Sequence, residues 1–138
     1  MAFSTVITAG IREKILADKF PSRIFRDTRE NYESKIKAVY KQVAEGCIDL
    51  QDKVGNYAND RIKIYLEKET EIRKILEEMP ASEDIYDMLD LVGLDMNEFY
   101  ARYGKEKIEK AILYAKDLKD RYTVLWLNYD LYGDGKNV

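Results

Sequence analysis

The chain has 138 residues and a formal net charge of −3, with 23 basic and 26 acidic residues mixed at short range. This length is typical of one domain with a substantial core. No apolar run approaches the ~20 residues that a membrane-spanning helix needs. A secretory signal requires basic residues before its apolar run, and none precede the short apolar run at this N-terminus. We therefore predict a cytoplasmic protein that binds neither membranes nor, lacking a concentrated basic face, nucleic acid.

Apolar residues recur at helical spacing throughout the chain, and no stretch alternates long enough to form a strand. We predict an all-α fold of five to seven helices in a single domain covering residues 1–138. The expected helical segments, in order, are residues 3–20, 27–46, 47–57, 59–79, 82–92, 96–103 and 105–131, with a loose tail over 133–138. Pro21 and Pro80 end the first and fourth segments, because proline cannot continue a helix interior.

The fifth expected segment begins at Ser82, which is suited to cap a helix N-terminus. It ends at Gly93, which is expected to adopt the left-handed conformation typical of a helix end. Its apolar residues recur every three or four positions and are expected to form the face buried against the core. These residues are Ile85, Met88, Leu89 and Val92.

Residues 105–131 are expected to form one long helix around which the rest of the chain packs. Thr123 and Val124 are β-branched and lower the local helix propensity by about 1 kcal/mol, which we expect burial of neighbouring side chains to offset. Trp126 lies on the apolar stripe of this segment and is expected in the core.

Two residues have alternative interpretations. Cys47 is the only cysteine and lies among apolar residues at helical spacing, so we interpret it as a small buried hydrophobe rather than a reactive thiol. Arg121 lies beside the apolar stripe. It either pairs with Asp117 or a neighbouring helix, or contacts an anionic ligand.

The residue inventory excludes the commonest catalytic centres. The sequence has no histidine, so it cannot form a Ser-His or Cys-His pair, an HExxH zinc site or a Glu-x-x-His di-iron site. It also contains neither GxGxxG nor GxxxxGK[ST], which removes the standard nucleotide-binding loops. Adjacent carboxylates such as Glu77 and Glu78 are typical of solvated helix faces. We predict no catalytic, cofactor-binding or metal-ligating residue in this chain.

The second half of the chain carries a family resemblance. The run ILEEMPASEDIYDMLDLVGLD, followed by a segment leading into AILYAKDLKDRYTVLWLNYDLYG, resembles the C-terminal helical region of bacterial sn-glycerol-1-phosphate dehydrogenases, relatives of glycerol dehydrogenase and dehydroquinate synthase. The similarity covers residues 48–133, whereas residues 1–47 match poorly. The motif and structural positions that the resemblance assigns are Asp120, Arg121, Tyr122, Thr123, Trp126 and Asp130.

The resemblance implies an NAD(P)-dependent reduction of dihydroxyacetone phosphate, assisted by a divalent metal. In that family a glycine-rich α/β half binds the nucleotide, and an aspartate and two histidines hold the metal. None of these parts can be assigned to this sequence. The motif positions are therefore expected to have a structural role, or to form a wall of the substrate cleft.

Two functions follow as hypotheses. In the first, the chain is the helical cap of the active-site cleft in a glycerol-1-phosphate dehydrogenase-like protein, inactive alone, and an N-terminal nucleotide-binding half carries NAD(P) and metal. In the second, it is a stand-alone module that binds a protein or ligand or forms a homo-oligomer. A catalyst in its own right is not favoured, because no convergent set of polar residues is visible. An apolar face is expected to be exposed where a missing partner docks.

Overall fold

The computed structural model describes residues 2–134, and every regular element in that range is a helix. The α-helices are α1 (Ala2–Ala17), α2 (Arg29–Tyr40), α3 (Ala44–Val54), α4 (Ile62–Glu67), α5 (Glu69–Glu77), α6 (Ser82–Leu91), α7 (Met96–Tyr103), α8 (Lys105–Ala115) and α9 (Val124–Tyr132). Short 3₁₀ turns are η1 (Lys41–Val43) and η2 (Lys116–Leu118). The all-α prediction is confirmed. Each of the seven expected segments is helical, but the fourth and the last are each divided into two α-helices. The break between the second and third segments lies at η1, and Gly46, where it was expected, lies inside α3.

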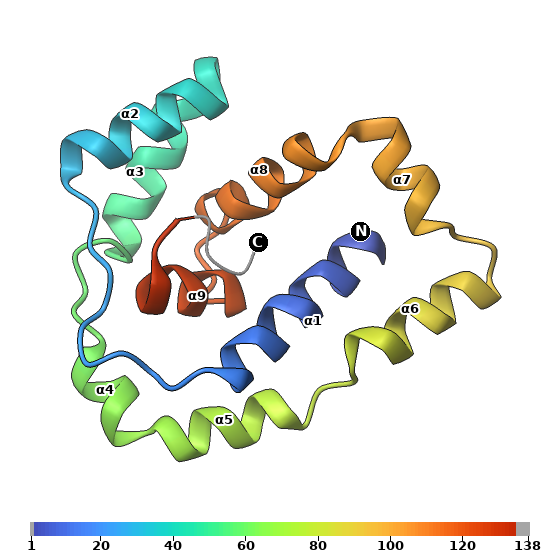
Figure 1. Ribbon diagram of the computed structural model, residues 1–138. Coiled ribbons are helices and arrows are strands. Elements are labelled where there is room, and N and C mark those ends of the chain that lie inside the picture. Colours follow the sequence, from blue (N-terminus) through green and yellow to red (C-terminus); the bar gives the residue numbers. More distant parts are fainter. Residues whose placement is uncertain (1, 135–138) are drawn as a thin grey trace.

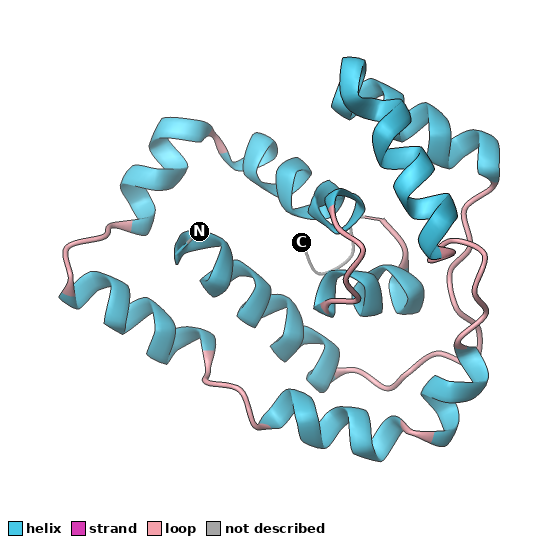
Figure 2. Cartoon of the chain, turned by 180° about the vertical axis from the view of Figure 1, so that it is seen from behind, coloured by secondary structure: helices cyan, strands magenta, loops and turns pink. Residues whose placement is uncertain are grey.

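The first helix, and not the last, occupies the centre of the molecule. Helices α4 to α8 follow an arc around α1, and α9 lies beside α1 inside this arc (Figure 1). Helices α2 and α3 pack against each other at one corner outside the arc, as the view from behind also shows (Figure 2). The arrangement gives α1 contacts with α5, α6 and α9. The N-terminal region therefore supplies the central helix.

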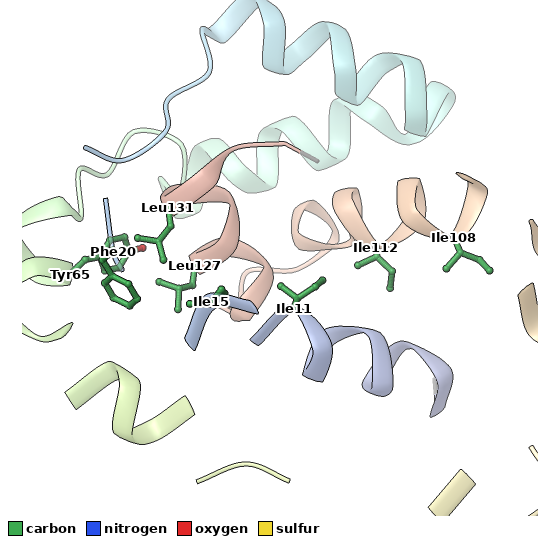
Figure 3. Packing of buried hydrophobic residues seen from close by; sticks show 8 residues of the cluster. All are labelled: Ile11, Ile15, Phe20, Tyr65, Ile108, Ile112, Leu127 and Leu131. Carbon is green, nitrogen blue, oxygen red and sulfur yellow. The ribbon is translucent and has the colours of Figure 1, made fainter. Parts of the chain in front are cut away.

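The main core lies between α1, α8 and α9 (Figure 3). Ile11 and Ile15, one helical turn apart on α1, are almost completely buried against Leu127 and Leu131 of α9. Burying an isoleucine or leucine side chain contributes roughly 1.5–3 kcal/mol, so this contact is a main source of stability. A second, smaller cluster joins α2 to α3. Its buried members are Tyr32, Ile36, Ala44, Cys47 and Ile48.

The prediction of one long helix over residues 105–131 is wrong. Helix α8 ends at Ala115 and continues only as the 3₁₀ turn η2. Lys119 is extended, with φ −137° and ψ 157°, and Thr123 is extended again immediately before α9 begins. Residues 119–123 therefore form a link that separates two short helices.

Tertiary hydrogen bonds explain the break. In an unbroken helix the carbonyls of Lys116, Asp117 and Lys119 would each accept from an N–H four residues later. Instead the Trp126 indole Nε1 donates to the Lys116 carbonyl at 3.1 Å. The Gln51 amide Nε2 donates to the Asp117 carbonyl at 3.1 Å and to the Lys119 carbonyl at 2.9 Å. Side chains from outside the helix, Trp126 ten positions after Lys116 and Gln51 66 positions before Asp117, thus satisfy the carbonyls that end it.

The predicted loose tail needs a partial correction. Gly133 is buried against the Phe25 ring, and the Lys35 ammonium lies 2.5 Å from the Asp134 carboxylate. These contacts fix the end of α9 against α2 and the segment that precedes it. The prediction for residues 135–138 lies outside the described residues. Across residues 2–134, no helix is both long and apolar enough to cross a membrane.

Candidate functional site

The six motif positions do not converge on one site. Asp120, Arg121 and Thr123 lie in the link between η2 and α9 and are exposed to solvent. Trp126 and Asp130, on α9, are completely buried, which confirms the predicted core position of Trp126. Tyr122 is 46% exposed. The structure thus separates an exposed half of the motif from a buried half.

Arg121 does not pair with Asp117. The break after η2 turns the Asp117 carboxylate into the protein interior, where it is 0% exposed, while Arg121 remains on the surface. Arg121 forms no salt bridge with any residue between 2 and 134. The predicted i,i+4 pair is wrong because the two residues do not share a helix. Contact of Arg121 with an anionic ligand stays a hypothesis.

Asp130 is the centre of one buried polar cluster. Its Oδ2 atom is 3.0 Å from Arg61 Nη1 and accepts a hydrogen bond from the Tyr65 hydroxyl. Its Oδ1 atom is 3.5 Å from Arg26 Nη1. The Tyr65 hydroxyl also bonds to the Tyr122 hydroxyl, which holds the exposed link against the interior. Burial raises the pKa of the Asp130 carboxyl, although Tyr65 and both arginines act in the opposite direction.

Asp117 is the centre of a second buried cluster. Its Oδ2 atom is 2.9 Å from Lys116 Nζ, and its Oδ1 atom accepts a hydrogen bond of 2.6 Å from the Tyr57 hydroxyl. Burial raises the pKa of Asp117, and it also raises that of the Tyr57 hydroxyl, which faces the carboxylate. The Lys116 ammonium lies 4.6–5.7 Å from the centroids of four aromatic rings. These rings belong to Tyr57, Tyr114, Trp126 and Tyr129.

Two amide side chains connect the clusters. Arg61 Nη2 donates to Asn56 Oδ1 at 2.7 Å, and Asn56 Nδ2 donates to Gln51 Oε1 at 3.0 Å. Gln51 in turn holds the carbonyls that follow Lys116. A continuous chain of hydrogen bonds therefore runs from Asp130 to the end of η2. We name it the buried polar network.

The buried polar network is suited to fixing structure rather than to catalysis. A general acid or base must come within hydrogen-bond reach of a substrate, and both carboxylates are fully enclosed. The sequence did not reveal Gln51 of α3, or Asn56 and Arg61 of the connection between α3 and α4, because an isolated polar residue carries no pattern that marks it as buried. Within the described part of the chain, no group of three or more His, Cys, Asp or Glu side chains could hold a metal ion.

Helix α6 presents an unexpected surface. Ile85 and Leu89 are partly buried on the side of α6 that packs along α1, and Ser82 bonds to the Glu13 carboxylate at 2.6 Å through both its N–H and its hydroxyl. Met88 and Val92, expected on the buried face, are instead 56% and 70% exposed. That prediction is wrong because the apolar arc of α6 is wider than the surface that α1 covers.

Four exposed apolar residues lie at the C-terminal end of α6 and in the turn that follows, and we name them the α6 surface. Leu91 is 86% exposed and shares a helix face with Met88, three residues earlier. Gly93, with φ 79°, ends the helix as predicted, and the Leu94 N–H donates to the Leu89 carbonyl at 2.9 Å. Leu94 is 39% exposed. The α6 surface consists of Met88, Leu91, Val92 and Leu94.

Acidic residues without a salt bridge lie next to the α6 surface in the sequence. Residues 75–101 contain eight aspartate and glutamate residues and no lysine or arginine. Five of the acidic residues are exposed on α6 or in the turn after it and form no salt bridge within residues 2–134. They are Glu83, Asp84, Asp87, Asp90 and Asp95. The α6 surface is therefore both apolar and strongly negative.

Comparison of the chain with protein-family models, curated proteins and solved structures found no match. The resemblance to glycerol-1-phosphate dehydrogenases accordingly stays a hypothesis that rests on the motif residues quoted above.

Proposed function

We propose that this chain is a non-catalytic helical cap that docks on a partner protein through the α6 surface. The observation that supports docking is the exposure of Met88, Leu91 and Val92 on one helix face. Contiguous apolar patches bordered by polar residues are typical of protein interaction sites. Covering such side chains stabilises a complex by roughly 25 cal/mol for each Å² of apolar surface removed from water.

We propose further that the partner is the nucleotide-binding half of a glycerol-1-phosphate dehydrogenase-like enzyme. This half binds NAD(P) and the divalent metal, and the present chain closes the cleft in which dihydroxyacetone phosphate is reduced. The proposal rests on the motif at residues 120–125 and on Asp130. In the structure Tyr122 ties the motif to the Asp130 cluster, which leaves Arg121 projecting from a fixed link. That placement suits a wall of a substrate cleft.

The test combines the chain with a bacterial glycerol-1-phosphate dehydrogenase from which the C-terminal helical region has been deleted. We expect the two proteins to co-elute in gel filtration and to restore oxidation of NADH by dihydroxyacetone phosphate. The double variant Leu91→Ser/Val92→Ser should lose both. A matched control, Val43→Ser/Ile64→Ser, removes two exposed apolar side chains of η1 and α4 and should retain both. Separate elution and no activity would refute the proposal.

A stand-alone binding module is the second candidate. A cavity of about 250 Å³ between α1, α7 and α8 favours it, because its lining is almost entirely apolar. The lining includes Ile7, Phe99, Ile108 and Ile112. This candidate predicts a stable monomer or homodimer that shows no dehydrogenase activity with any partner half. Ile108→Trp, which would fill the cavity, should abolish binding of a small apolar fluorescent probe.

A further inference from the structure

We infer that the partner element that covers the α6 surface is a basic amphipathic helix. This inference rests on the proposed docking function and adds the chemistry of the partner. The charge distribution supports it. No positive charge lies between Lys74 and Arg102 in the sequence, and the exposed carboxylates around α6 form no salt bridge with other described residues. A partner with positive charges beside an apolar stripe would satisfy both features of the surface.

The spacing of the residues fits a helix laid along α6. Asp84 lies one turn before Met88, and Asp87 lies one turn before Leu91. Carboxylates therefore border the apolar side chains along the helix axis rather than on the opposite face. Amphipathic helices dock through apolar anchors at three- and four-residue spacing, and charged residues at their flanks fix register and orientation. Met88 adds a flexible, polarisable side chain that adapts to different anchors.

Two other occupants fit this surface less well. In a symmetric dimer the same patch meets itself, so Asp84, Asp87 and Asp90 would face like charges. An anionic membrane would repel the patch in the same way. A basic helix is the occupant that both the apolar and the acidic residues favour.

The inference is tested with two designed peptides. One carries leucines at helical spacing with flanking lysines, and the other replaces every lysine by glutamate. Fluorescence anisotropy should show binding of the lysine peptide alone, weakening as salt rises from about 0.05 M to about 0.5 M. Asp84→Lys/Asp87→Lys should weaken binding at least about tenfold. Glu30→Lys/Asp49→Lys alters net charge equally on α2 and α3 and should leave binding within about twofold. Circular dichroism checks that each variant folds.

Equal affinity for both peptides, or equal losses in both double variants, would overturn the inference. Concentration-dependent dimerisation that Leu91→Ser/Val92→Ser abolishes would also overturn it, by assigning the surface to a second copy of the chain. The truncated dehydrogenase separates this inference from the proposed function. One outcome is that Leu91→Ser/Val92→Ser prevents binding of the truncated dehydrogenase while Asp84→Lys/Asp87→Lys does not. That result would support docking through the α6 surface and refute the basic partner helix. If neither variant affects a complex that forms, the α6 surface is not the docking site.

Discussion

Replacing Trp126 by alanine tests the proposed role of α9 as part of the core. The indole is 0% exposed, and its ring contacts Tyr57 and Tyr129 edge-on, with centroid distances of 4.9 and 5.7 Å. Deleting a buried aromatic side chain costs about 3–5 kcal/mol, from lost burial and from the cavity that remains. The substitution also leaves the Lys116 carbonyl without its indole donor, which adds to the cost. We expect a loss near the upper end of this range.

Trp126→Phe separates the two contributions. Phenylalanine keeps most of the buried ring but cannot donate to the Lys116 carbonyl, so we expect a loss of about 1–3 kcal/mol. The free energy of unfolding is measured by urea denaturation with circular dichroism at 222 nm, because the alanine variant contains no tryptophan for fluorescence. Leu91→Ala, on the exposed α6 surface, serves as control and should change stability by less than about 0.5 kcal/mol.

A loss below about 1 kcal/mol in Trp126→Ala would refute the reasoning, because it would place the indole outside the packed core. A domain of this size is stable by only about 5–15 kcal/mol. The expected loss is therefore a large fraction of the total, and the urea midpoint should fall clearly with an unchanged slope.

Three further predictions concern titration, backbone and thiol chemistry. Burial raises the pKa of Asp130 above its ordinary 3.8, so the folded state binds this proton more tightly than the unfolded state. Its stabilising contribution is complete below about pH 3.8 and is lost as pH rises through the raised folded pKa. The stability deficit of Asp130→Asn should therefore shrink as pH rises above about 4, and a growing deficit would contradict this. Gly133→Ala should destabilise by about 2 kcal/mol or more in urea titrations, because φ is +80° and the new Cβ would lie 2.8 Å from the Phe25 ring. Gly46→Ala, inside α3 with no atom within 4 Å, is the control and should stabilise by about 0.5–1 kcal/mol. Cys47 is buried and burial raises its thiol pKa, so a thiol reagent should modify it slowly until urea unfolds the chain; rapid native modification would refute this.

The proposed docking function and the buried polar network are connected through the link at residues 119–123. Tyr122 reaches the Asp130 cluster, while Arg121 remains on the surface. A substitution in the buried polar network that lets the link move should therefore displace Arg121, which we propose lines the cleft of the partner. It should do so before it alters the position of the α6 surface. The link belongs to no helix, whereas the α6 surface lies at the C-terminal end of α6.

The sequence by itself determined the secondary structure class and most helix positions. Helical periodicity and the absence of alternation identified seven helical segments, and Pro21, Pro80 and Gly93 marked ends correctly, because proline and glycine act on the backbone locally. The burial of Trp126 also followed from its place on an apolar stripe. The dehydrogenase resemblance is a different kind of inference and stays a hypothesis.

Only the tertiary structure decided where the last helix breaks, which helix is central, and which apolar face stays exposed. Gln51 and Trp126 donate to the carbonyls that would have continued the helix past η2. No local pattern reveals the bond between Gln51 and Asp117, which lie 66 positions apart. The α6 stripe looks like a buried face in sequence, but a stripe shows only that a surface is apolar. Whether the stripe is covered depends on how much of it the neighbouring α1 contacts, and α1 leaves Met88 and Val92 exposed to water.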